Sequence, residues 1–193
     1  MPWGAIVGSG WAGGLNIYAT VFLLGLAGRL EWADTPTQLQ STAVLALAAG
    51  AYAVEFVADK IPYIDNAWDA AHTIIRPLGA AWLAGILSGD TAWTDRPWIA
   101  VGAALLALSS HSAKATTRAA VNVTPEPFSN IALSVAEDGI VAGMVTLALV
   151  HPTAAAVVAL VGAGACIFVT FKLIRFAGRV FRPRKSVGEP DRP

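Results

Sequence analysis

The fold is decided by residues 55–77, EFVADKIPYIDNAWDAAHTIIRP, in which ionisable side chains lie between two strongly apolar flanks. If the chain is helical after the proline of this stretch, Asp65, Asp69, His72 and Arg76 recur at i, i+4, i+7 and i+11 and share one face. Ionisable side chains between apolar spans are costly in a membrane unless they pair or serve a function. We therefore expect the rest of the chain to fold around this charged stripe.

Composition indicates that lipid is the solvent of this chain. Of the 193 residues 55% are hydrophobic and 13% are charged, and the mean hydropathy is +0.58, whereas soluble domains average about 25% charged residues. The formal net charge is zero, so no nucleic-acid partner is predicted. The lone Cys166 excludes a disulfide framework within one chain and a site of several cysteines.

A spanning helix needs about 20 mostly apolar residues. On this basis we predict an all-α integral membrane bundle that crosses the bilayer several times, with about six spans in one transmembrane domain over residues 1–175. Prolines break the chain in two polar segments, around Pro62 and around Pro125 and Pro127. The predicted spans are 6–28, 41–58, 73–87, 98–112, 130–150 and 153–171.

Basic residues predict the orientation. Residues 176–193 form a basic tail, and the loops around Lys60 and around Lys114 and Arg118 are also positive. The positive-inside rule places all of these on the cytoplasmic side, and six spans then place the N-terminus there as well. No Lys or Arg precedes the first apolar run, so we expect the first span to stay in the mature protein.

The start of the first span is rich in glycine, with Gly8, Gly10, Gly13 and Gly14 ahead of Asn16. Two interpretations are open. Small residues allow helices to pack closely in a membrane, whereas an unwound segment would expose backbone groups to a cavity.

Two polar segments show a weak internal repeat, although two amphipathic pieces can align in this way by chance. The same 0, 4, 7 spacing occurs at Asp65, Asp69 and His72 and at Asn130, Ser134 and Glu137. The charges of the two halves have opposite signs, so we expect the halves to neutralise each other. The predicted pairs are Glu55 or Asp59 with Lys114 or Arg118, and Arg76 with Glu137 or Asp138. As neighbours on a helix, Glu137 and Asp138 should point about 100° apart.

The strings SGWAGGLNIYAT, EFVADKIPYIDNAWDAAHTIIRPLGA, SHSAKATTRAAVNVTPEPFSN and SVAEDGIVAG resemble a bacterial membrane-protein family, domain of unknown function 4126. The resemblance covers Ser9 to Phe171 and implies a small multispanning protein of the bacterial inner membrane. It does not indicate which activity the protein has. It also implies a polar signature at Asn16, Glu55, Asp59, Lys60, Asp69, His72, Arg76, Lys114, Arg118, Asn122, Glu126, Asn130, Glu137 and Asp138.

The leading functional hypothesis is a transporter or channel for a small polar or ionic solute, coupled to protons in one version. Its partners would be the lipid bilayer and the solute, and the sequence permits a homo-oligomer. Repeated, broken polar helices are typical of transporters. The predicted path is lined by Asn16, Glu55, Asp59, Asp69, His72, Arg76, His111, Lys114, Arg118, Asn130, Glu137 and Asp138.

Two other classes are open. Asp65, Asp69 and His72 offer two carboxylates and an imidazole on one helix face, which suits a divalent metal such as Mn²⁺, Zn²⁺ or Mg²⁺, although Arg76 on the same stripe would repel it. A metal-dependent membrane enzyme acting on lipid headgroups is therefore one alternative. A structural or assembly protein whose charges form only salt bridges is the other. No Ser-His-Asp or Cys-His set predicts covalent catalysis.

Overall fold

The computed structural model describes residues 1–89, 96–123 and 127–180, and within them the only regular secondary structure is helical. The all-α prediction is therefore confirmed for this part of the chain. The helices are α1 (Trp3–Leu15), α2 (Ile17–Arg29), α3 (Thr37–Gln40), α4 (Thr42–Ala58), α5 (Ile64–Ser88), α7 (Pro97–Val121), α8 (Pro127–Val150) and α9 (Pro152–Val180).

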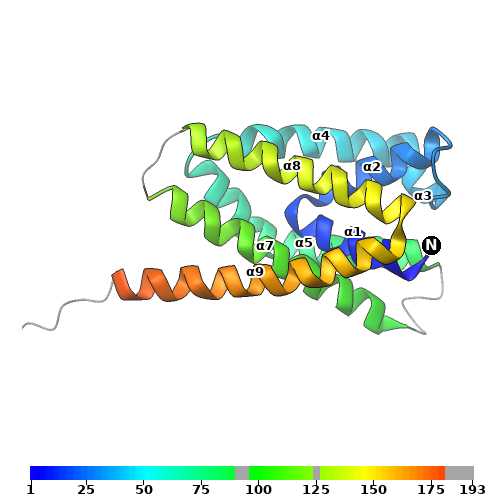
Figure 1. The fold of residues 1–193 in the computed structure, drawn as a ribbon. Coiled ribbons are helices and arrows are strands. Elements are labelled where there is room, and N and C mark those ends of the chain that lie inside the picture. Colours follow the sequence, from blue (N-terminus) through cyan, green and yellow to red (C-terminus); the bar gives the residue numbers. More distant parts are fainter. Residues whose placement is uncertain (90–95, 124–126, 181–193) are drawn as a thin grey trace, which may run out of the picture.

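The first predicted span, 6–28, is two short helices that meet at Asn16. Asn16 is extended (φ −156°, ψ 101°) and its side chain caps α2 by accepting from the Ala19 N–H at 2.9 Å. From there α2 runs back toward the end of the bundle where α1 began (Figure 1). Each helix has 13 residues, about 20 Å, which is less than the roughly 30 Å of hydrocarbon. The prediction of one continuous span here is wrong, because the cap at Asn16 lets the chain reverse.

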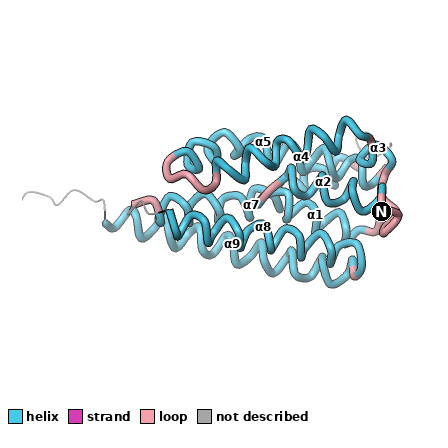
Figure 2. Tube along the Cα trace, turned by 90° about the horizontal axis from the view of Figure 1, so that it is seen from above, coloured by secondary structure: helices cyan, strands magenta, loops and turns pink. Residues whose placement is uncertain are grey.

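Five longer helices, α4, α5, α7, α8 and α9, run along the bundle (Figure 2). They alternate in direction, as the colours along the chain show (Figure 1). Among the described residues three of them, α5, α8 and α9, are long and apolar enough to cross a membrane. The prediction of six spans is not supported. Several helices are longer than predicted. Helix α5 begins at Ile64 and α7 continues to Val121 because their polar side chains face inward and find partners there. Helix α9 continues past the predicted end at residue 171 to Val180.

The two ends of the described chain lie at opposite ends of the bundle (Figure 1). The N-terminal amine donates to the Leu87 carbonyl at 2.7 Å, and the Trp3 ring stacks on Trp98 at 4.9 Å, so Met1 lies beside the end of α5 and the start of α7. The far end of α9 projects from the other end of the bundle. The sequence predicted both termini on one side of a membrane. In the structure the α1–α2 hairpin returns the chain to the end of the bundle where α1 began, so the two described ends lie apart. Of the predicted tail, residues 181–193 lie outside the described residues.

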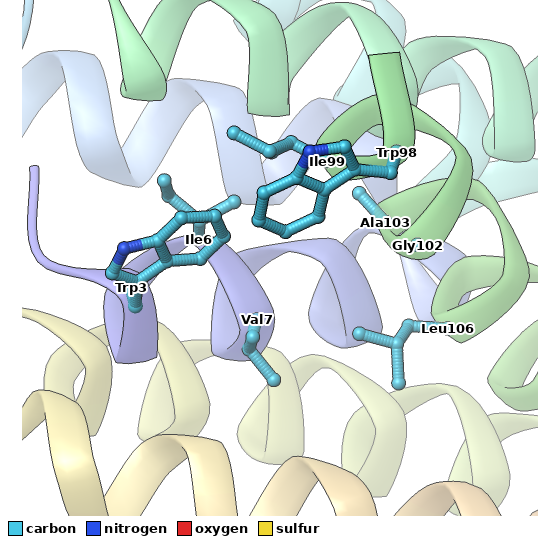
Figure 3. A pocket seen from close by; sticks show the side chains of 8 residues that line it. All are labelled: Trp3, Ile6, Val7, Trp98, Ile99, Gly102, Ala103 and Leu106. Atoms are coloured by element: carbon cyan, nitrogen blue, oxygen red, sulfur yellow. The ribbon is translucent and has the colours of Figure 1, made fainter. Parts of the chain in front are cut away.

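A small apolar cavity of about 110 Å³ opens beside this tryptophan pair (Figure 3). Its wall comes from α1 and α7, including Ile6, Ile99 and Leu106. It contains no charged side chain, so it does not belong to the polar part of the molecule.

Helix α1 lies at the centre of the bundle, and all of its residues except Trp3 and Val7 are buried. Its glycines let neighbouring backbones approach. A Cβ at Gly10 would lie 3.2 Å from the Ala103 Cα, and a Cβ at Gly14 would overlap the Ala107 backbone, both on α7. The interpretation that the glycines allow close helix packing is confirmed. The glycines themselves are helical, and the helix is interrupted after them, at Asn16.

The outer surface is strongly apolar. In the apolar 18-residue stretch of α9, only 17% is buried inside the bundle. Large apolar side chains also project outward from α4, α5, α7 and α8. Apolar patches of this extent are not kept exposed to water. They fit a hydrocarbon environment. Examples are Leu47, Ile74, Leu78, Leu105, Val135, Val157, Val161 and Phe168.

The close contact at Gly14 predicts that a larger residue at this position destabilises the fold. We expect Gly14→Ala to lower the free energy of unfolding by about 1–3 kcal/mol, because the methyl group would overlap the α7 backbone. Gly143→Ala on α8 is the matched control, since nothing lies within 4 Å of its Cβ position, and it should leave stability unchanged or improve it. Thermal unfolding in detergent measures both. Equal effects would contradict the proposed packing.

Candidate functional site

The charged stripe that the sequence predicted lies on the inner face of α5. Asp65, Asp69, His72 and Arg76 are all buried, with at most 2% of each residue exposed. The end of α4 and the second half of α7 pack against this face and bring their own charges, and the first half of α8 adds Glu137 beside Lys114 and Arg118. The result is an ion-pair network inside the bundle.

Arg76 forms the part of this network nearest the helix break. Its Nη2 donates to Glu55 Oε1 at 2.8 Å and lies 3.3 Å from Asp69 Oδ1. Its Nη1 donates to the Gly14 carbonyl at 3.2 Å and to His111 Nδ1 at 2.7 Å. Arg76 thus joins α4, α5, α7 and the end of α1.

His111 is a neutral hydrogen-bonding residue in this arrangement. Because Nδ1 accepts from Arg76, the ring proton is on Nε2, which lies 3.1 Å from Thr73 Oγ1 and donates to it. Thr73 in turn donates to the Asp69 carbonyl at 3.1 Å.

Lys114 and Arg118, one turn apart on α7, form the second part. Lys114 Nζ donates to Asp59 Oδ2 at 2.7 Å and is 3.4 Å from both Glu55 Oε1 and Glu137 Oε2. Arg118 Nη2 donates to Glu137 Oε2 at 2.5 Å and to Asp59 Oδ2 at 3.2 Å. The predicted pairing of Glu55 and Asp59 with Lys114 and Arg118 is confirmed.

The predicted partner of Arg76 is wrong. Glu137 pairs with Arg118 and Lys114 instead. The reason is position along the bundle, because α4 places Glu55 next to Arg76 while α8 brings Glu137 to the level of Arg118. Asp138 is half-buried on a different face of α8, near Lys60 and Tyr52, so the prediction that the adjacent acids point apart is confirmed.

The broken helix and the network form one unit. The last carbonyls of a helix lack partners within the helix and carry its negative dipole end. At the end of α1 these carbonyls accept from buried cations, Gly14 O from Arg76 and Leu15 O from Lys114 at 3.3 Å. Asn16 lies at this point, but its side chain serves the α2 cap.

A chain of amides continues the network toward the start of α8. Asn122 Nδ2 donates to both oxygens of Asp65, at 2.9 and 3.0 Å, and Asn130 Nδ2 donates to Asn122 Oδ1 at 2.8 Å. Arg118 Nη1 is 3.6 Å from Asp65 Oδ2. Glu126, which belongs to the polar signature, lies outside the described residues.

The three candidate metal ligands turn to different partners. Asp65 faces Asn122 and Asp69 faces Arg76, while His72 Nε2 lies 3.1 Å from the Tyr18 hydroxyl. Among the described residues no group of three or more His, Cys, Asp or Glu side chains is placed to hold a metal ion. The divalent-metal site stays a prediction without support from this arrangement.

Two further polar side chains belong to the site without having been predicted from the sequence, Tyr18 and Thr73. Thr73 is four residues after Asp69, so the helical spacing that identified the stripe could have found it. Tyr18 is in the hairpin, and no local pattern predicts that its hydroxyl reaches His72. It also lines an apolar groove of about 430 Å³ between α2, α4 and α5.

Negative charge is in excess within the network. In the described part of the chain, three basic side chains, Arg76, Lys114 and Arg118, form its ion pairs with five carboxylates. Several carboxylate oxygens are buried without a hydrogen-bond partner in the described structure. They are Glu55 Oε2, Asp59 Oδ1 and both oxygens of Asp69.

Comparison with known proteins gives a family and no activity. A family model described as "Domain of unknown function (DUF4126)" matches residues 4–172. No curated protein and no solved structure matches the chain.

Removing one buried cation should be costly. Arg76→Met leaves Glu55 and Asp69 without their nearest counter-charge, and we expect the free energy of unfolding to fall by about 3–5 kcal/mol. Arg29 is exposed and donates to Thr42 at 2.8 Å, so Arg29→Met should cost less than about 1 kcal/mol. Unfolding by heat or SDS in detergent measures the difference. If Arg76→Met lowered the free energy of unfolding no more than Arg29→Met, the network would not be what holds the helices together.

Proposed function

We propose that this chain, which belongs to the DUF4126 family, is an integral membrane transporter for a small polar or ionic solute and is coupled to protons. The observation that supports this most directly is the excess of buried carboxylates at the end of a broken helix. The proposed path follows the predicted set, with Glu55, Asp59, Asp69 and Lys114 at its centre.

The charge balance argues against a purely structural role. A framework of salt bridges needs matched charges, because each unpaired charge in a membrane interior costs at least about 2.5–3.5 kcal/mol. Here five carboxylates meet three basic side chains in the described network. Two protons, or one proton and one monovalent cation, would restore neutrality. A site that takes up positive charge in this way is suited to coupled transport.

The α1–α2 hairpin provides an element that can move. Transporters commonly place binding sites at the ends of half-helices, where backbone carbonyls or amides face the solute. In this chain α1 ends inside the bundle, and its Gly14 and Leu15 carbonyls contact Arg76 and Lys114. A shift of the hairpin would therefore change the contacts of both cations at once.

We further infer the orientation in the bacterial inner membrane. The end of α4 and the far end of α9 lie at the same end of the bundle (Figure 1). Lys60 follows α4 directly, and Lys172, Arg175 and Arg179 belong to the last part of α9. The positive-inside rule places this end in the cytoplasm. Five crossings and a hairpin that returns to its own side then place the N-terminus on the other side.

Cysteine labelling tests this orientation. In a Cys166→Ala background we expect Gln38→Cys and Val123→Cys to react with an impermeant maleimide from opposite faces of the membrane, and Val123→Cys from the cytoplasmic face. Both positions are exposed, Gln38 in α3 and Val123 just after α7. Helix α3 and the end of α7 lie at opposite ends of the bundle (Figure 1). Labelling of both from one face would contradict the proposed topology.

Flux into proteoliposomes tests transport. With a pH dye inside and a panel of small ionic solutes outside, we expect at least one solute to change the internal pH. Asp69→Asn should reduce that change by about tenfold or more, because the amide cannot exchange a proton. Its carboxylate makes no hydrogen bond in the described structure, and its ion-pair partner Arg76 keeps the shorter contact to Glu55 at 2.8 Å, so the variant should keep the fold.

Glu31→Gln in the exposed loop after α2 is the control and should transport normally. If no solute changes the internal pH, or if Asp69→Asn matches the wild type, the proposed function is wrong.

A further inference from the structure

We infer that the oxygen cage around Lys114 Nζ is the solute site, and that the solute is a small cation of the ammonium type, R–NH₃⁺, which binds there in place of the lysine's own ammonium. This inference rests on the proposed transport function and names its substrate class.

The cage has the composition that recognises an ammonium. Four oxygens surround Lys114 Nζ, at distances from 2.7 to 3.4 Å. Three come from carboxylates, Glu55 and Asp59 at the end of α4 and Glu137 on α8, and one is the Leu15 carbonyl at the end of α1. An ammonium has three N–H donors and no acceptor, so a site built only of acceptors matches it.

Of the three buried cations, Lys114 is the one that can withdraw. Arg76 and Arg118 each use a planar, forked group to contact several helices, and Arg118 also donates to the Asp59 carbonyl at 2.7 Å. A lysine ammonium is a compact point charge on a flexible stem. A change of rotamer would vacate the cage without dismantling the arginine contacts, and a small R–NH₃⁺ would present the same charge and the same donors.

Unused acceptors in the same carboxylates support the exchange. Glu55 Oε2 and Asp59 Oδ1 are buried without a hydrogen-bond partner in the described residues, and so are both oxygens of Asp69 nearby. Glu55 and Asp59 are 0% and 3% exposed. Because the surrounding network has five carboxylates and three basic side chains, the cage can accept the incoming cation before Lys114 has left.

The charge and geometry favour a monovalent ammonium over a metal ion. No described group of His, Cys, Asp and Glu is arranged for metal binding, whereas one ammonium already occupies the cage. The neighbouring Arg118 Nη2 lies 3.2 Å from Asp59 Oδ2, and its charge would oppose a divalent ion more strongly than a monovalent one.

Thermal unfolding of the purified full-length protein in detergent tests the site at constant ionic strength. The probes are the chlorides of ammonium, methylammonium, ethylammonium, sodium and choline. We expect ammonium, or one of the two primary amines, to raise the Tm by about 3 °C or more above the value in sodium, and choline to have no such effect. The order of the three active probes distinguishes free ammonium from a primary amine.

Chemical rescue provides the second measurement. Lys114→Met should have a lowered Tm in sodium chloride, and methylammonium or ethylammonium should recover at least half of the loss. Lys172→Met, which removes an exposed lysine on α9, is the matched control and should show no amine-dependent recovery. If Lys114→Met does not fold, the wild-type probe series decides alone.

The outcomes separate this inference from the proposed function. A selective shift by ammonium or an amine in the wild type supports the site, and its absence overturns it. Rescue of Lys114→Met without any wild-type shift means that Lys114 occupies the cage permanently, which also overturns it. If the proteoliposomes transport other solutes while amines have no effect, transport stands and the ammonium site fails. If amines stabilise the protein but no solute changes the internal pH, the site stands and transport fails.

Discussion

The attraction between opposite charges in a low-dielectric interior is the constraint on which the other features of this structure depend. Arg76, Lys114 and Arg118 have almost no exposed side-chain surface, at 0%, 1% and 0%. Charges buried so deeply must each be placed within a few ångströms of an opposite charge or a carbonyl. That requirement determines where α4, α5, α7 and α8 sit along one another, because each contributes one side of an ion pair.

The broken first helix follows from the same requirement. A continuous helix through residues 6–28 would have bonded its own carbonyls and offered none to the cations. By ending at Leu15, α1 presents its last carbonyls to Arg76 and Lys114, and Asn16 caps the amides of α2. Gly10 and Gly14 then let α7 pack close to α1, so that Lys114 reaches the Leu15 carbonyl. The helix break, the glycines and the buried charges therefore depend on one another.

Such a network is an expensive way to stabilise a fold. Well-packed apolar side chains can replace buried ion pairs at little cost or with a gain in stability, and this chain has many apolar residues elsewhere. The described network also holds more carboxylates than basic side chains and leaves several of their oxygens without hydrogen bonds. These features are hard to explain as support for the fold, and they are the ones on which we base the proposal of a site that binds and releases positive charge.

The sequence by itself determined the helical class, the apolar outer surface and the membership of the α5 stripe, because these depend on composition and on the 3.6-residue period of a helix. It also predicted that Glu55 and Asp59 meet Lys114 and Arg118, since opposite charges must pair. Only the tertiary structure decided that the chain reverses at Asn16, that the two ends of the described chain lie apart, and that Arg76 pairs with Glu55 and Asp69 instead of Glu137. Those outcomes depend on the relative positions along the bundle axis of helices that are distant in sequence. A local sequence pattern specifies which face of a helix is buried, but it does not specify where along the bundle axis that helix lies.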